Sequence, residues 1–197
     1  MFTKLIIATT ISLLLVEFAC AQGTFLYDQQ SSDESNLMEG GASISDSQSF
    51  TPSLSAVGFI RLYVYDGFPG FNSATIFVNL RKDSVNGAVL ASTVTVDLGD
   101  GFVGPVDFFF SEPVAVTPGT TYYFDGQVQS GSGGFGLNAS SSYGYSGGTA
   151  YLQGMVWPNT DVWFREGIVV PEPSVATLIF VAGLTVAGCQ HSKRKSV

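Results

Sequence analysis

Short runs of alternating apolar and polar residues fill the middle of the chain. In residues 55–65, Ile60, Leu62 and Val64 share one face of an extended backbone, and residues 74–81 repeat the pattern. Successive side chains of a strand point to opposite faces, so a period of two indicates a half-buried β-strand. The same reasoning predicts further strands at residues 89–96, 106–110, 121–128, 150–155 and 162–166.

Turn-forming pairs separate these runs. They are Asp66-Gly67, Pro69-Gly70, Asn86-Gly87, Asp100-Gly101 and Pro118-Gly119. Proline presets φ and glycine accepts a positive φ, which tight turns require. Residues 130–148 are rich in Gly and Ser, and we interpret them as a loop that carries a short strand at 135–139. The sequence therefore predicts an all-β domain over residues 22–169, a single β-sandwich with jelly-roll-like or Greek-key connections.

The first residues have the features of a secretory signal peptide. Lys4 gives a positive start, residues 5–16 are apolar, and the Ala-Cys-Ala tripeptide at 19–21 offers the small residues that a signal peptidase recognises. We therefore predict that residues 1–21 are cleaved off. The alternative, a permanent membrane helix, requires a longer apolar run than this one, which Glu17 interrupts.

The end of the chain, residues 170–197, has three consecutive parts. The first is a Pro-Glu-Pro segment that stays extended, because its prolines cannot continue a helix. Residues 175–189 are apolar and uncharged, which predicts a hydrophobic transmembrane helix, and residues 191–197 are basic. That helix reaches about 22 Å at ~1.5 Å per residue, and snorkelling basic side chains extend it toward the ~30 Å hydrocarbon core. Basic residues stay on the cytoplasmic side, so the middle domain is expected outside the cytoplasm.

This tripartite end resembles the PEP-CTERM sorting signal of Gram-negative bacteria. The resemblance implies processing by exosortase, a membrane-embedded cysteine transpeptidase whose genes accompany exopolysaccharide export. It also implies that Pro171, Glu172 and Pro173 form the recognition element, as a substrate site and not a catalytic one. The basic tail is formed by Lys193, Arg194 and Lys195, where the family more often has an Arg-rich cluster. The alternative is an ordinary tail anchor behind a Pro-rich linker, in which case the tail survives.

The middle domain resembles the choice-of-anchor domains that precede surface-sorting tails. The resemblance rests on residues 116–124, a turn followed by a strand, and on residues 48–51. It implies a β-sandwich at the cell surface and implies no biochemical activity.

The negative charge of the chain argues against anionic partners. The chain has a net charge of −8, and residues 22–170 hold 14 acidic and four basic side chains. Such a surface repels phosphate groups, so we expect neither nucleic-acid binding nor attraction to anionic lipid.

Cysteine and histidine are confined to the ends of the chain, as Cys20, Cys189 and His191. A processed domain would lack a disulfide, a thiolate or imidazole zinc site, a Cys nucleophile and a Ser-His-Asp triad. An enzyme would have to use carboxylates alone, as glycoside hydrolases do, and no motif singles out such a pair. We therefore predict a protein without enzymatic activity.

Two candidate ligand sites remain. Asp97 and Asp100 flank a Gly-containing turn and offer carboxylates for Ca²⁺, with Asp107 and Glu112 as neighbours, and the alternative, which we favour, is a solvated acidic turn. The last third of the chain gathers aromatic residues that suit stacking on sugar rings or, alternatively, core packing. These residues are Tyr143, Tyr145, Tyr151, Trp157 and Trp163, and we expect Tyr143 and Tyr145 to be the exposed ones that contact a glycan.

The sequence thus predicts an exported, non-enzymatic surface or extracellular protein, sorted by exosortase and associated with exopolysaccharide or matrix. The alternative is a carbohydrate-binding module, and a third class is a Ca²⁺-stabilised adhesin. A mostly buried set of Tyr and Trp side chains favours the structural role. A coplanar exposed pair beside Asn, Gln or Asp favours sugar binding.

Overall fold

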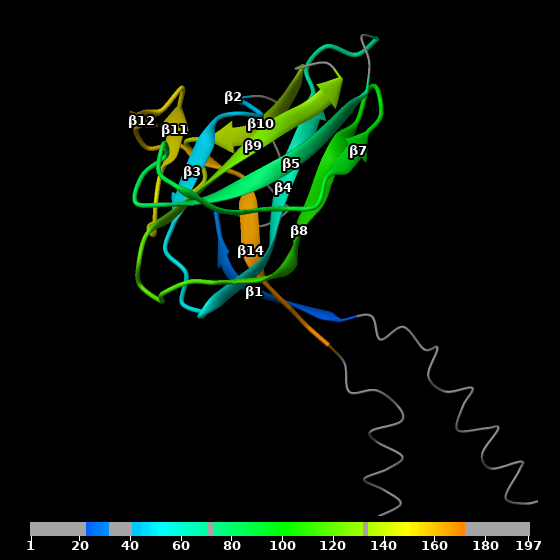
Figure 1. Ribbon diagram of the computed structural model, residues 1–197. Helices are drawn as coiled ribbons and strands as arrows, with labels where there is room; N and C mark the ends of the chain where they lie inside the picture. Colours follow the sequence, from blue (N-terminus) through cyan, green and yellow to red (C-terminus); the bar gives the residue numbers. More distant parts are fainter. Residues whose placement is uncertain (1–22, 32–40, 71–72, 132–133, 172–197) are drawn as a thin grey trace, which may run out of the picture. The chain divides into compact units, whose positions relative to one another are not determined.

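The computed structural model describes residues 23–31, 41–70, 73–131 and 134–171 (Figure 1). The predicted signal peptide, transmembrane segment and basic tail lie outside the described residues, as do Glu172 and Pro173. The chain divides into two compact units, and the unit described here is Phe25–Val169. Within the described ranges, no helix has the length and apolar character needed to cross a membrane.

The fold is all-β and consists of two antiparallel sheets, as the sequence predicted. The first sheet contains β1 (Thr24–Gln30), β2 (Gly41–Ser43), β4 (Ala56–Asp66), β8 (Val103–Ala115), β10 (Phe135–Ser140), β13 (Asp161–Val162) and β14 (Phe164–Val170). The second sheet contains β3 (Ser47–Phe50), β5 (Ala74–Lys82), β6 (Val89–Ser92), β7 (Val96–Leu98), β9 (Tyr122–Gly131), β11 (Ala150–Leu152) and β12 (Met155–Trp157).

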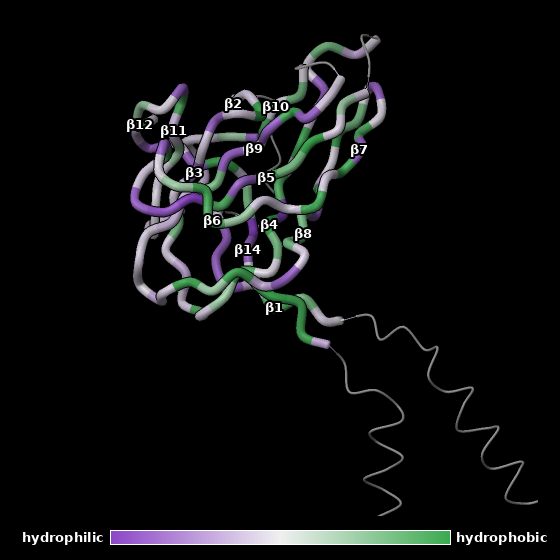
Figure 2. The backbone as a smooth tube through the Cα atoms, viewed as in Figure 1, coloured by the Kyte–Doolittle hydropathy of each residue, from purple (hydrophilic) through white to green (hydrophobic). Residues whose placement is uncertain are grey.

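Each sheet is organised around one long strand. In the first, β4 pairs with β8 along one edge and with β14 and then β10 along the other. In the second, β5 pairs with β9 along one edge and with β6 and β7 along the other. Both central strands are those with the clearest alternation, and green apolar residues recur along them in Figure 2. The alternation thus located the two strands that organise the sheets.

The core lies between the sheets. Ile60 and Leu62 of β4, and Ile76 and Val78 of β5, are fully buried, as their period of two predicts. Phenyl rings join the two layers at the centre: the ring of Phe164 lies 5.3 Å from Phe124 and 6.2 Å from Phe50, and both of those residues belong to the second sheet. Burial of a single side chain of this size contributes roughly 2–3 kcal/mol.

Three predicted strands are divided in the structure, which corrects the sequence prediction. Residues 89–96 split at Thr93, whose hydroxyl accepts a hydrogen bond from the Val78 N–H, and the next residue, Val94, donates to Phe109 in the first sheet. The chain therefore leaves the second sheet at this point. Residues 150–155 split at a turn in which Gln153 and Gly154 both have positive φ.

Residues 162–166 are divided in the same way at Trp163. Its N–H donates to the Asn138 carbonyl of β10, whereas the N–H of Phe164 donates to the Ser31 hydroxyl. Strand β8 is longer than the predicted 106–110, because β8 pairs on one edge only and an edge strand tolerates the prolines Pro105 and Pro113. Strands β1, β2 and β3 were not predicted as strands.

Candidate functional site

The predicted calcium ligands are each engaged with a donor of the protein. The Asp97 carboxylate on β7 accepts from the Thr75 hydroxyl at 2.7 Å, and that of Asp100 accepts from the Gly70 N–H at 2.7 Å. Asp107 forms an ion pair with Arg61 at 2.5 Å. No group of three or more Asp, Glu, His or Cys side chains that could hold a metal ion occurs in the part of the chain that the structure describes.

The predicted glycan residues lie together but are more buried than the sequence analysis expected. Tyr143 is 4% exposed and its hydroxyl donates to Asn138, which corrects the expectation that it is exposed. Tyr145 is half-buried: its hydroxyl accepts from the Thr51 N–H and donates to Gln29, and its ring packs edge-on against Phe164. Both side chains therefore support the fold.

A polar cavity of about 490 Å³ nevertheless opens beside these two tyrosines. Its walls are the Gly/Ser-rich segment and the turn before β13, and they include Asp161. That carboxylate is also fully engaged, because it accepts from the Gln48 side chain at 3.0 Å and from the Tyr145 N–H at 3.1 Å. The two tyrosine hydroxyls and the Asp161 carboxylate in the lining of this cavity are thus bonded to the protein.

The remaining aromatic candidates follow the same trend. Trp163 is fully buried, and Trp157 is half-buried against the core. Tyr151 pairs with Tyr123 at an interplanar angle of 66°, so the two rings are not coplanar. By the criterion set from the sequence, the predicted aromatic set supports a structural role, and any ligand site has to be sought among polar groups.

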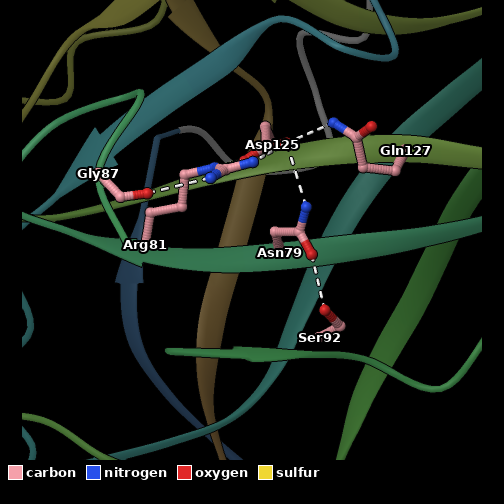
Figure 3. A network of polar contacts seen from close by, with 6 residues as sticks. All are labelled: Asn79, Arg81, Gly87, Ser92, Asp125 and Gln127. Carbon is pink, nitrogen blue, oxygen red and sulfur yellow. Dashed lines mark hydrogen bonds and ion pairs between the residues drawn. The ribbon is translucent and has the colours of Figure 1, made fainter. Parts of the chain in front are cut away.

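A second polar site lies across β5 and β9, on the face of the second sheet opposite to the core. Arg81 of β5 contacts Asp125 of β9 through Nε and Oδ1 at 2.5 Å (Figure 3). Asp125 also accepts from the amides of Asn79 at 3.4 Å and Gln127 at 2.5 Å. The network continues through Asn79 to Ser92 on β6, at 2.7 Å. Pairing of β5 with β9 brings these residues together, because Asn79 lies directly opposite Asp125 in the register.

Two turns complete this site into a cavity of about 280 Å³. Asn86 comes from the turn that follows β5, and Gln153 comes from the tip of the β11–β12 hairpin. Asp46 fixes the tip of the β11–β12 hairpin. Its carboxylate accepts hydrogen bonds from the Gln153 N–H at 2.9 Å and from the Ser43 N–H at 2.9 Å. We refer to this cavity, lined by Arg81, Asp125, Gln127, Asn86, Gln153, Asp46 and their neighbours, as the amide cavity.

The sequence held a partial signal for the amide cavity. Alternation in residues 74–81 places Asn79 and Arg81 on the face opposite to the core residues. What the sequence alone did not reveal is that β9 pairs with this strand and supplies Asp125 and Gln127. That pairing joins segments 46 residues apart, so no local pattern reports it.

A third group of polar residues is buried at the contact between β1 and β14. Glu166 is fully buried, and no hydrogen bond of good geometry reaches either of its carboxyl oxygens. Its neighbour is the carboxylate of Asp28, which accepts from the backbone N–H groups of Ser53 and Leu54 at 2.7 and 2.8 Å. Two neighbouring carboxylates repel each other when both are ionised, which favours the protonated form of the more buried one.

The pKa values of the two carboxyl groups shift in opposite directions. Burial, and then the negative charge of Asp28, raises the pKa of Glu166 to about 8, against a smaller opposing effect of the Gln29 backbone. Burial alone would also raise the pKa of Asp28, but hydrogen bonds from Ser53 and Leu54 outweigh it and lower that pKa. At neutral pH, Glu166 is therefore mostly protonated, whereas Asp28 is ionised.

No family model matches this chain, and no curated protein matches it either. Inferences about its function therefore rest on the chain's own residues and on the geometry described above.

Proposed function

We propose that this chain is an exported, non-enzymatic protein of the cell surface or extracellular matrix, sorted through a PEP-CTERM tail by exosortase. The observation that carries the proposal is the order of three features at the end of the sequence: Pro171-Glu172-Pro173, the apolar residues 175–189 and the basic residues 191–197. Residues 1–21, with the features of a signal peptide, support export. Pro171 is exposed, as a segment that a processing enzyme binds has to be.

The proposed architecture is that of a choice-of-anchor-like ectodomain with jelly-roll-like or Greek-key connections. Strands from distant parts of the sequence alternate within each sheet, which supports such connections: β3 lies between β11 and β9, and β4 lies between β14 and β8. Signal peptidase and exosortase are the proposed processing partners, and exopolysaccharide is the proposed environment of the mature protein.

The proposal that the protein is not an enzyme is supported by the state of its carboxylates. The pair of Asp28 and Glu166 has the unequal protonation that acid–base catalysis by two carboxyl groups uses. A substrate cannot reach this pair, because Glu166 is fully shielded from solvent and Asp28 is occupied by the Ser53–Leu54 turn. We therefore assign Asp28 and Glu166 a structural role.

The sorting proposal is tested by following the full-length chain in a Gram-negative host that contains an exosortase. Glu172→Ala, at the centre of the recognition element, should abolish the processed form and leave the precursor in the membrane, as should deletion of the exosortase gene. Glu112→Ala is the matched control, since Glu112 is an exposed glutamate on β8. Normal processing of the Glu172→Ala variant would contradict the proposal.

Carbohydrate binding at the cell surface is the second candidate function. The observation that favours it is the presence of polar cavities whose walls carry amide and hydroxyl groups, the groups that recognise sugar hydroxyls. It is compatible with sorting to the surface, because a matrix protein has to contact polysaccharide in some way.

A further inference from the structure

We propose that the amide cavity binds a neutral, hydroxyl-rich saccharide, one ring at a time. This inference rests on carbohydrate binding, the second function proposed above, and assigns it to a site different from the Tyr143 and Tyr145 predicted from the sequence. The volume of the amide cavity, about 280 Å³, lies just below the ~300–1,000 Å³ typical of ligand pockets, which suits a single sugar ring.

The hydrogen-bonding groups that remain available in the amide cavity are neutral and have both polarities. Within the described ranges of the chain, no protein group bonds to the side-chain amides of Asn86 and Gln153 or to Oε1 of Gln127. A primary amide offers two donors and one acceptor oxygen. Groups of this kind on several sides of a cavity match hydroxyl groups, which also donate and accept.

Charge in the amide cavity is neutralised within the protein. The guanidinium of Arg81 is used by Asp125 and by the Gly87 carbonyl at 3.0 Å. The two oxygens of Asp46 accept from the Gln153 and Ser43 N–H groups, as described above. No charged group is thus left to attract a phosphate or an amine, and the net charge of −10 over residues 22–170 disfavours acidic polysaccharides as well.

The turns around the amide cavity are held in unusual backbone conformations. Gln153 has φ 51° and Asp83, at the start of the opposite turn, has φ 70°. Left-handed backbone costs a non-glycine residue of order 1–3 kcal/mol, and strain of this kind concentrates at functional sites. Here it brings the hairpin tip toward the turn after β5: a Cβ added to Gly154 would lie 3.8 Å from the Asn86 amide nitrogen.

Two tyrosine rings lie opposite residues of the amide cavity, although neither belongs to its lining. Tyr123 lies opposite Arg81 in the register, and Tyr151 lies opposite Ser47, a residue of the cavity wall. The two rings contact each other with their centroids 5.8 Å apart, and both are half-buried. Saccharide sites commonly combine polar groups with such a ring, because the sugar also has an apolar face.

The amide cavity is a better candidate than the cavity beside Tyr145. In the latter, the tyrosine hydroxyls and both oxygens of Asp161 are already bonded to the protein. The amide cavity combines a largely buried ion pair with unpaired amides from two exposed turns, so a ligand gains hydrogen bonds without displacing protein contacts.

The test uses the full-length chain, purified in a detergent without a sugar headgroup, on an array of neutral hexose and N-acetylhexosamine oligosaccharides with uronic-acid oligosaccharides beside them. The affinity of the strongest ligand is then measured by calorimetry. The double variant Asn86→Ala/Gln153→Gly removes two amides from exposed turns and leaves the ion pair intact, and glycine suits the positive φ at 153. Thermal unfolding checks that it remains folded.

We expect neutral oligosaccharides to bind and the double variant to bind them at least about tenfold more weakly, the loss expected for a pair of hydrogen bonds. Gln127→Ala should weaken binding too, whereas the control Gln129→Ala, two residues further along β9 and outside the cavity, should not. If the double variant keeps the wild-type affinity and Thr149→Ala, beside Tyr145, loses it, the saccharide binds in the other cavity. That result would overturn the assignment to the amide cavity and retain carbohydrate binding as the function. Absence of binding to every glycan would overturn carbohydrate binding itself, and binding of only uronic-acid oligosaccharides would overturn the neutral ligand.

Discussion

The carboxyl pair of Asp28 and Glu166 predicts that the domain loses stability as the pH rises toward 8. The pKa of Glu166 is raised by burial and by Asp28 to about 8 in the folded chain, from an ordinary value of 4.5. Between these two values, the folded chain retains a proton that the unfolded chain has released. The free energy of unfolding therefore falls as the pH rises, because the folded state binds more protons.

The size of the effect follows from the two pKa values. A full proton difference changes the free energy of unfolding by about 1.4 kcal/mol per pH unit, so the loss between pH 5 and 7.5 is about 3 kcal/mol. Asp28 acts in the opposite sense: its pKa is lowered, so its contribution is present above 3.8 and is lost only as the pH falls below that value. Asp161 has a pKa raised by burial and adds a loss of the same sign as Glu166.

Comparison of the wild type with Glu166→Gln isolates the contribution of Glu166 to the pH dependence of the free energy of unfolding. The substituted amide keeps the shape of the side chain and can donate to Asp28 at every pH. Urea unfolding of the full-length chain, followed by the fluorescence of the buried Trp163, is measured at pH 5 and 7.5. We expect the wild type to lose about 3 kcal/mol relative to the variant over this range. The exposed control Glu112→Gln should keep the wild-type slope, and equal pH dependence of wild type and Glu166→Gln would refute the raised pKa of Glu166.

Three further predictions concern stability. Arg81→Ala leaves the carboxylate of Asp125 buried without its cation and should lower the free energy of unfolding by about 3 kcal/mol in urea titrations. The control Lys82→Ala, at an exposed neighbouring residue, should change this free energy by less than about 0.5 kcal/mol. Gly167→Ala places a methyl group against the backbone of β1 at Leu26 and should cost at least about 2 kcal/mol; an unchanged melting temperature would show that β1 does not pack there. Addition of Ca²⁺ should leave the melting temperature of the wild type unchanged, and a rise would indicate a calcium site.

Period-two patterning was sufficient for the strands whose two faces differ. In β4 and β5, every second residue is an aliphatic residue of the core, so the sequence predicted both strands within one or two residues, and the opposite face of β4 also carries the buried Phe59. The pattern failed for β3, whose sequence Ser-Gln-Ser-Phe is polar and yet buried. Gln48 is stabilised there by hydrogen bonds to Asp161 and Val162, more than 100 residues away, which no local pattern reports.

The candidate sites show the same limit. The sequence analysis expected Tyr143 and Tyr145 to be exposed, but the direction of their rings depends on Asn138, Gln29 and Phe164, which come from three separate strands. Glu166 held a weak signal: two residues after a core phenylalanine in one strand, it has to share the buried face. Its pairing with Asp28 is set by the contact between β1 and β14, and β1 was not predicted.

The central claim is that the chain is exported and processed at both ends, and the intact mass of the mature protein from its native host tests it most directly. We predict a species that begins at Gln22 and ends near Pro171, with or without an attached group. A mass that extends from Gln22 through Val197 would show that the tail is a permanent anchor and would contradict the sorting assignment. A mass that begins at Met1 would contradict export through a cleaved signal peptide.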